Sequence, residues 1–509
     1  MTREQFLRST TLATASLAAG CRYQSSPQPS AVARTHECLD KIKRFDRSGP
    51  GLRAVIEINP DALAIAQKLD QEKARGPLHG QPILIKDNLD THDRMVTSAG
   101  SLALAESIPP TDSFVVKKLR DAGLVIAGKT NMSEWANFRG YRSISGWSGR
   151  GGQTLNPHCL DRSPSGSSSG SAAAVAMGYT PYAVGTETNG SIVSPSSCCG
   201  IVGFKPTVGL VSRTGIIPIS SSQDTAGPMA RTVKEASALL AIMLGPDPQD
   251  AATTNNAGEI ESHRELLLNL KPAQKARIGI ATELFGMHPL VDPVFTAAIG
   301  KLKQCGVEMV ESVPLPSIRD LGRADLTVMT YEYKAGLNDY FKRLGNESKI
   351  KTIDDLIAFN ESESERELWL FGQERLLDAA KCGALDSPEY LDAKKKCVTW
   401  SDSLKAVFAR HQLDAIVAPT SGPAATIDFI HGDRGLGGCS TYAAVAGLPH
   451  ITIPCGNVKG LPLGLSFFGP SWSEPKLASI ALAFESVCQA RITPNLLPMI
   501  RLDEGPSAG

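Results

Sequence analysis

The sequence has no surplus of charge of either sign, since Lys and Arg together number 52 and Asp and Glu together number 52. A protein that binds nucleic acid usually carries a basic surface, and this neutral chain gives no sign of one. The sequence also lacks any run of about 18 to 20 apolar residues, the length that a membrane-spanning helix requires. We therefore expect neither a nucleic-acid partner nor a transmembrane span.

Recognisable cysteine motifs are also missing. The eleven cysteines contain no C-x-x-C pair and no Cys/His spacing typical of a metal site, and an odd number cannot all form internal disulfides. The adjacent pair Cys198 and Cys199 has poor geometry for a disulfide. We interpret most of the cysteines as small buried thiols.

The N-terminal segment differs in composition from the rest. Arg3 and Arg8 precede the small, weakly apolar stretch TLATASLAAG, which ends at Cys21. The order basic, apolar, small is that of an export signal, and LAAG followed by cysteine is similar to a lipoprotein cleavage site. We expect residues 1–34 to be a signal-like segment and linker, with Cys21 as a candidate lipid anchor. An exported or envelope-associated location is favoured, and a cytoplasmic one follows if this segment is not a signal.

The remaining chain alternates between strand-like and helix-like segments. Short apolar runs of strand length recur along it, and segments with helical spacing, such as 112–122, lie between them. This alternation predicts one α/β domain over 35–495, with a large central sheet, and a tail over 496–509. The charged pattern of 335–412 predicts an inserted helical lid or flank. The predicted strands are PILI (82–85), LVIA (124–127), YAVG (182–185), IGIA (278–281), DAIVA (414–418), ITIP (451–454) and LGLSFF (463–468).

One motif match suggests a nucleotide site. Residues 123–130, GLVIAGKT, fit the P-loop pattern G-x-x-x-x-G-K-[ST]. A P-loop follows its strand and offers free backbone N–H groups to phosphate. Here the four middle residues are apolar and favour a buried strand, whose N–H groups would be used in the sheet. We therefore disfavour a phosphate site.

A second match suggests an ester hydrolase. Residues 166–170, GSSSG, fit the nucleophile elbow G-x-S-x-G, with Ser168 as the nucleophile. An elbow needs a strand before it and a helix after it. The apolar segment 171–178 predicts the helix, but the polar, proline-containing segment 158–165 predicts no strand. Later histidines at 411, 431 and 450 are only loose candidates for the triad that this alternative needs.

A third pattern joins three separate segments. Lys86 ends the strand-like run PILI, the GSSSGS turn precedes a helix, and Ser191 follows Asn189-Gly190 after another strand. Gly190 lies in a turn where backbone N–H groups can point at one spot, as an oxyanion hole requires. A lysine after four apolar residues can be neutral and accept a proton, and a serine hydroxyl can be the nucleophile.

These segments resemble the motifs of the amidase signature family, whose members carry a Lys–cis-Ser–Ser triad. Its lysine motif matches residues 86–88 (KDN), its Gly/Ser-rich turn matches 165–170 (SGSSSG), and its nucleophile motif matches 185–192 (GTETNGSI). The similarity extends over about residues 35–490 and is most specific in 81–232. The sequence differs from the family pattern at two positions: it has Val193 where most members have Arg, and Ser165 where most members have Gly. Both departures resemble the bacterial peptide amidase branch.

The resemblance implies a mixed central sheet covered by helices on both faces, and it implies roles for individual residues. Ser191 would attack, Ser167 would relay the proton after a cis peptide bond, and Lys86 would accept it. Backbone N–H groups among Thr188, Asn189, Gly190 and Ser191 would hold the oxyanion, and Ser168 would also face the substrate. Asp224 and Arg231 are interpreted as scaffold before substrate contacts. No metal or cofactor is needed.

The sequence thus predicts an amidase that releases ammonia from a carboxamide, with C-terminally amidated peptides as the expected substrates. Small aliphatic or aryl amides are the first alternative, because loops shape the pocket. An amidotransferase component is the second, because the same fold serves there, although that role needs partner subunits. A non-catalytic envelope binding protein is the third, and it would need no complete triad.

Overall fold

The computed structural model describes residues 29–255, 257–346 and 348–500. Residues 1–28 of the predicted signal-like segment lie outside the described residues, and so does the candidate lipid anchor Cys21. Helix α2 (Ala31–Ile42) already begins before the predicted boundary at residue 35. Of the predicted tail, residues 496–500 are described, and the Leu160 N–H donates to the Leu497 carbonyl at 2.7 Å. The described part of the tail is therefore bound to the body of the protein.

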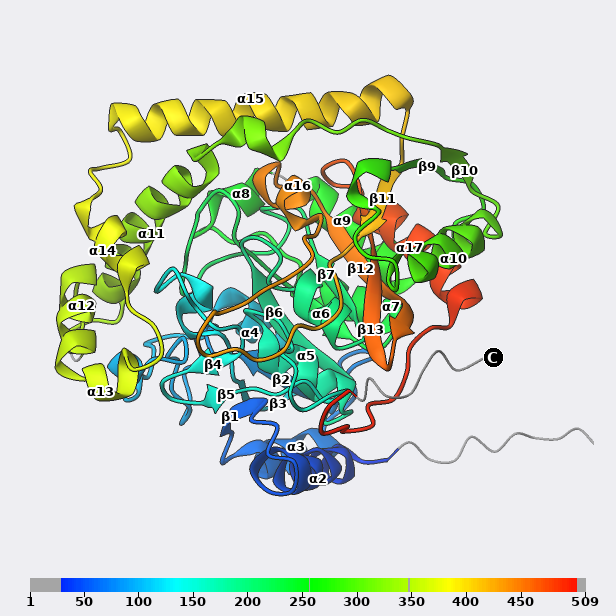
Figure 1. Ribbon diagram of the computed structural model, residues 1–509. Helices are drawn as coiled ribbons and strands as arrows, with labels where there is room; N and C mark the ends of the chain where they lie inside the picture. The colour runs from blue at the N-terminus through cyan, green and yellow to red at the C-terminus, as the bar shows by residue number, and fades with distance from the viewer. Residues whose placement is uncertain (1–28, 256, 347, 501–509) are drawn as a thin grey trace, which may run out of the picture.

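An eleven-stranded sheet forms the centre of the protein (Figure 1). It is mixed: β2 pairs in parallel with β3 and β6, and β9 pairs in parallel with β10 and β11, whereas the other pairs are antiparallel. The expected α/β class with a large mixed sheet is confirmed. In sheet order the strands are β1 (Val55–Ile58), β3 (Val125–Thr130), β2 (Pro82–Lys86), β6 (Tyr182–Glu187), β8 (Thr225–Ala230), β7 (Val202–Lys205), β12 (His450–Val458), β13 (Leu461–Phe468), β11 (Ala415–Pro419), β9 (Arg277–Ile280) and β10 (Glu308–Val310).

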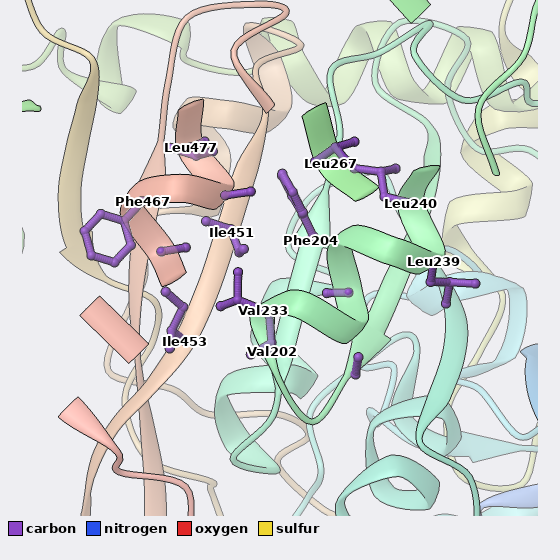
Figure 2. Close-up of a cluster of buried hydrophobic side chains, with 14 of the residues drawn as sticks. Val202, Phe204, Val233, Leu239, Leu240, Leu267, Ile451, Ile453, Phe467 and Leu477 are labelled. Atoms are coloured by element: carbon purple, nitrogen blue, oxygen red, sulfur yellow. The ribbon is translucent and has the colours of Figure 1, made fainter. Parts of the chain in front are cut away.

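Helices cover both faces of the sheet because successive strand residues point to opposite sides. In β2, Ile83 and Ile85 pack into one core and Leu84 packs into the other. Figure 2 shows the first core, where Phe204 and Ile451 of the sheet face Leu240 and other helical residues. The first face carries α4 (Phe114–Asp121), α7 (Val233–Met243), α9 (Ala257–Leu268), α10 (Asp292–Lys303) and α17 (Glu474–Cys488); the second carries α2, α3 (Ala62–Asp70), α5 (Ser169–Ala176), α6 (Val193–Cys198) and α16 (Ser440–Val445).

A helical segment flanks one end of the sheet. It begins at Ala324, earlier than the predicted insertion at 335, and α15 runs along the top of Figure 1. Its residues Tyr333 and Phe341 pack against Trp135 and the loop around Ile217. The segment therefore covers loops at the strand ends. Its helices are α11 (Ala324–Arg343), α12 (Ile353–Ser362), α13 (Ser364–Glu367), α14 (Glu374–Lys381) and α15 (Pro388–His411).

The remaining short elements are α8 (Ala251–Thr254) and a small two-stranded sheet of β4 (Trp147–Ser148) and β5 (Gly152–Gln153). Among the described helices, none combines the length and the apolar character needed to cross a bilayer. The ten cysteines that the structure describes are free thiols, and most are buried, as the sequence predicts.

A fully buried arginine joins the helical segment to the body. Arg139 contacts Glu134 at 2.5 Å and Glu367 of α13 at 3.3 Å, and all three side chains are inaccessible to solvent. Its guanidinium also lies 4.0 Å from the centre of the Phe371 ring. The arginine therefore bridges two buried acidic side chains and attaches α13 to the loop that carries Glu134.

Replacing Arg139 by methionine should lower the free energy of unfolding by about 3–5 kcal/mol, because two buried carboxylates lose their cation. Urea denaturation would measure the loss. The matched control is Arg366→Met, which removes an exposed pair with Glu363 on the same helix and should cost less than about 1 kcal/mol. Equal losses for the two variants would contradict the structural role of the buried cluster.

Candidate active site

Two neighbouring parallel strands, β2 and β6, bring the predicted lysine to the edge of the sheet. Lys86 is the last residue of β2, and Ile85 pairs with Val184 of β6. Because Lys86 alternates with Ile85, it points to the same face as Leu84, toward α5. The carboxyl ends of β2 and β6 therefore meet the turn that precedes α5.

The Lys86 amine is fully buried and makes three hydrogen bonds. Its Nζ lies 2.8 Å from the Ser167 Oγ, 2.9 Å from the Thr186 Oγ1 and 3.2 Å from the Thr186 carbonyl. Burial lowers the pKa of Lys86 from 10.5 to about 7, although the charges of Asp224 and Glu187 oppose this shift. A substantial fraction of the amine is thus neutral at physiological pH and can accept a proton.

The neighbouring Asp87 points away from the amine, as expected for adjacent residues of an extended segment. Its carboxylate accepts hydrogen bonds from the Gly100 N–H at 3.1 Å and from the Ser98 hydroxyl, and it lies 3.7 Å from Arg150. Asp87 therefore bonds other partners and does not form an ion pair with the Lys86 amine.

Asp224 is the first of the two carboxylates that favour the charged lysine. Replacing it by asparagine should lower the pKa of Lys86 further, because the opposing negative charge is removed. If the neutral amine is the active form, the acid limb of kcat/KM moves to lower pH. A pH profile from 5 to 9 measures this shift. An unchanged or upward-shifted limb would contradict it, and Asp392→Asn, an exposed charge change on α15, is the control.

The Ser-rich turn places Ser167 beside the lysine. The peptide bond between Gly166 and Ser167 is cis, as the family resemblance implies, and Ser167 is fully buried. Gly185 of β6 leaves the room that this turn needs, since a Cβ there would lie 2.8 Å from the Ser168 Oγ. Close packing of the turn on β6 thus requires glycine at 185.

The structure does not place Ser168 toward a substrate. Its hydroxyl donates to the Thr186 carbonyl at 3.1 Å and accepts from the Thr186 N–H at 3.2 Å, and its own N–H donates to the Ser191 carbonyl. The side chain is buried and bonded to the backbone. Ser168 therefore has a scaffold role here, in place of the predicted substrate contact. They also disfavour the elbow alternative, in which Ser168 would be exposed.

The turn after β6 carries Ser191. Ser191 is half-buried, and its carbonyl receives the Ser168 N–H at 3.2 Å, which joins the two predicted serine segments. Among the described residues, the Ser191 hydroxyl makes no hydrogen bond, so the predicted bridge from Ser167 is formed only on the Lys86 side. The hydroxyl is therefore free to bond a ligand or to turn toward Ser167.

Backbone N–H groups of this turn are also free. In the described parts of the chain, the N–H groups of Asn189, Gly190 and Ser191 have no acceptor. Glu187 instead accepts the next two N–H groups, those of Ile192 at 2.7 Å and Val193 at 3.0 Å. The Thr188 N–H likewise has no acceptor among the described residues, so the turn offers four consecutive unpaired donors of the kind that an oxyanion hole requires.

Side chains from distant segments hold this turn in place. The Ser440 hydroxyl donates to the Asn189 Oδ1 at 2.8 Å, and the Asn189 Nδ2 donates to the Thr441 Oγ1 at 3.2 Å. The Thr188 hydroxyl donates to Asp224 at 2.6 Å. Asp224 also accepts two backbone N–H groups, whereas the one ion pair of Arg231 within the described residues is with Glu235 on the next helix. Both predicted scaffold residues have scaffold contacts.

A cavity of about 480 Å³ lies between the strand ends and helix α11. Thr186, Glu187 and Thr188 form part of its wall, and Gly336 of α11 forms part of the opposite wall. Ser191 itself does not line it. The cavity therefore reaches the residues beside the serine turn, and its size suits a ligand of drug or dipeptide size.

The P-loop alternative is wrong. Residues 125–130 form β3, and the buried Lys129 amine donates to the Leu89 carbonyl at 2.6 Å and to the Thr97 Oγ1 at 2.8 Å. Its backbone belongs to the sheet and its lysine is already bonded within the protein, so neither can bind phosphate.

Sequence reasoning missed three polar residues of the site. Thr186 bonds Lys86, Asn88 donates to the Thr186 Oγ1 at 3.0 Å, and Glu187 caps the turn after Ser191. All three lie within two residues of Lys86 or at the end of the adjacent strand. The predicted strands 82–85 and 182–185 were a signal for them, because residues that follow two neighbouring parallel strands meet at the same edge of the sheet.

Comparison with known proteins identifies a matching family and several similar proteins. The sequence pattern of the Amidase family matches residues 34–478. The chain is 46% identical to the peptide amidase of Stenotrophomonas maltophilia, with a TM-score of 0.86 over 92% of this chain and 96% of that one. It is 37% identical to an Arabidopsis thaliana protein named as a probable amidase, over 90% of this chain and 87% of that protein. It is 35% identical to one component of the glutamyl-tRNA(Gln) amidotransferase of Gloeothece citriformis, over 90% of this chain and 94% of that component.

Proposed function

Because the chain belongs to the amidase family and is a hydrolase that acts on amides, we propose that it converts C-terminal peptide amides into acids and ammonia through an acyl-serine intermediate. The observation that carries this proposal is the Lys86 amine, which is fully buried and lies 2.8 Å from the Ser167 hydroxyl. A buried amine with a pKa of about 7 is suited to general-base chemistry at neutral pH.

In acylation, the Ser191 Oγ forms a bond with the amide carbon. Its proton passes to the Ser167 hydroxyl, which gives its own proton to the neutral Lys86 amine, since a hydroxyl can donate and accept at once. The free N–H groups of Asn189, Gly190 and Ser191 stabilise the oxyanion of the tetrahedral intermediate. The carbon–nitrogen bond then breaks, and the nitrogen takes the proton back through the same path and leaves as ammonia.

In deacylation, water replaces ammonia. It attacks the ester carbon of acyl-Ser191 and loses a proton through Ser167 to Lys86, and the oxyanion occupies the same N–H groups. The carbon–oxygen bond to Ser191 breaks, the serine recovers its proton, and a carboxylic acid leaves. Because the neutral amine is needed in both halves, we expect kcat/KM to fall as the pH decreases through about 7.

Two observations support a peptide substrate. The relative that is 46% identical over most of both chains is a peptide amidase. The cavity of about 480 Å³ is larger than a small amide needs and is partly apolar, with Ile216, Ile217 and Ile219 in its wall. Room for side chains next to the reacting carbonyl suits an amidated peptide better than an isolated aliphatic amide.

Ammonia release from a substrate panel tests the proposal. The purified chain is given dipeptide amides, benzamide, propionamide, glutamine and asparagine, and initial rates are compared. We expect the dipeptide amides to have the highest kcat/KM. Faster hydrolysis of benzamide or propionamide would overturn the peptide assignment, glutamine as the sole substrate would favour the amidotransferase alternative, and no ammonia from any amide would overturn the proposed chemistry.

A further inference from the structure

The wall of the cavity carries more acids than bases. Its ionisable residues are five carboxylates and two arginines: Glu187, Asp224, Asp250, Glu332, Asp339, Arg213 and Arg343. The electrostatic character of the cavity therefore depends on which of these charges are already paired.

Both arginines are paired with carboxylates. The guanidinium of Arg213 makes two hydrogen bonds to Asp250, at 2.6 and 2.8 Å. The guanidinium of Arg343 donates to Asp90 at 2.7 Å and stacks on the Tyr340 ring. Each guanidinium is therefore already bonded to a carboxyl group of the protein, so a carboxylate on a substrate would have to compete for it.

Three carboxylates of the wall form no direct ion pair with a basic side chain of the described chain. Asp339 of α11 is exposed, and among the described residues it forms no ion pair or side-chain hydrogen bond. Glu187 is only 1% exposed, and its Oε1 has no hydrogen-bond partner in the described chain. Asp224 is bonded only to neutral donors. Glu332, in contrast, lies 3.3 Å from Lys394.

From this arrangement we propose that the cavity selects amides whose acyl part carries a positive charge, with Asp339 as the residue that determines this preference. This inference rests on the proposed amidase function. An ammonium or guanidinium group in the cavity would meet carboxylates that form no ion pair, whereas a substrate carboxylate would meet the same carboxylates and find both arginines already bonded within the protein. The preferred substrates are therefore peptide amides with a basic side chain next to the scissile amide, and those with an acidic side chain are disfavoured.

The same charges would assist turnover. The substrate amide is neutral and the product is a carboxylate, so the product enters a region of negative potential as it forms. Repulsion between like charges raises the free energy of the bound product relative to the bound amide. The enzyme should consequently show weak inhibition by the acid products of its own substrates.

Three substrates of similar size test the preference: the α-amides of N-acetyl-lysine, N-acetyl-norleucine and N-acetyl-glutamate. We expect kcat/KM to decrease in that order at low ionic strength. Asp339→Asn should reduce the ratio of the lysine to the norleucine amide by roughly two- to fivefold, as for other solvent-accessible charge pairs. Added salt at about 0.5 M should compress the ratio in the unmodified enzyme.

Asp392→Asn is the matched control, because Asp392 is an exposed aspartate of α15 that does not line the cavity. It should leave the ratio as in the unmodified enzyme. Equal ratios in the unmodified enzyme and Asp339→Asn, or equal hydrolysis of the glutamate and lysine amides, would overturn the charge preference alone. No hydrolysis of the norleucine amide or any other amide would instead overturn the proposed function.

Discussion

Replacing Ser191 by alanine should lower kcat for a peptide amide by roughly 10⁴- to 10⁶-fold, as for other serine hydrolases that lose their nucleophile. Without the hydroxyl no acyl-enzyme can form, and the buried Lys86 has no nucleophile to activate. The fold should be unaffected, because the Ser191 side chain makes no hydrogen bond within the described chain and only its carbonyl receives the Ser168 N–H. Ammonia release and mass spectrometry of trapped acyl-enzyme would measure the loss.

Two serine variants act as controls for this result. Ser194→Ala removes a half-buried hydroxyl three residues further along, in the first turn of α6, and should change kcat less than tenfold. Ser168→Ala should reduce stability by about 1–3 kcal/mol, since it leaves the Thr186 N–H without an acceptor and removes one of the two donors to the Thr186 carbonyl. If Ser168→Ala abolished acylation and Ser191→Ala did not, the assignment of the nucleophile would be wrong.

The strands that could be predicted from the sequence are those with continuous apolar runs. PILI, ITIP and LGLSFF read as buried strands, and they form β2, β12 and β13. Strand β8 was missed because its sequence, TAGPMA, contains Gly227 and Pro228, which are typical of turns. Strand β8 nevertheless lies in the middle of the sheet. Glycine is required at position 227, because a Cβ there would lie 2.2 Å from the Phe204 carbonyl.

The site could be predicted only as far as local motifs extend. Lys86, Ser167 and Ser191 belong to three short motifs, and the parallel pairing of β2 with β6 explains why Lys86 and the turn that carries Ser191 lie at the same edge of the sheet. The contacts of Ser440 and Thr441 with Asn189 join residues about 250 positions apart. No periodicity or spacing predicts such a pair, because it depends on the pairing of β12 with β7, which joins the C-terminal half of the chain to the half of the sheet that contains β6.

Replacing Lys86 by methionine should abolish activity to a similar extent as Ser191→Ala, because methionine has nearly the same length and no basic group. Lys86→Arg is expected to be equally inactive, since a guanidinium remains protonated at any working pH. Ammonia release at about pH 8, above the pKa of the lysine, would measure both variants. Activity within tenfold of the unmodified enzyme in either variant would contradict the role of Lys86 as the general base.

The methionine variant should also reveal what the buried amine costs in stability. With a folded pKa of about 7 and an unfolded value of 10.5, the unfolded chain binds more protons between these values, so the stability of the unmodified protein rises with pH there. Below pH 7 the amine is charged in both states, and the folded protein bears the full penalty of roughly 5 kcal/mol, at about 1.4 kcal/mol per pKa unit. Methionine has no such dependence.

Lys86→Met should therefore gain most, relative to the unmodified protein, at about pH 6, and this advantage should shrink as the pH is raised to about 9.5. The hydrogen bonds from Lys86 to Ser167 and Thr186 are lost at every pH, so they offset the absolute difference without changing its slope. Urea denaturation of both proteins at the two pH values measures the slope. A stability difference that does not vary with pH would mean that the amine keeps its ordinary pKa, and the proton-accepting role that depends on a neutral lysine would fail with it.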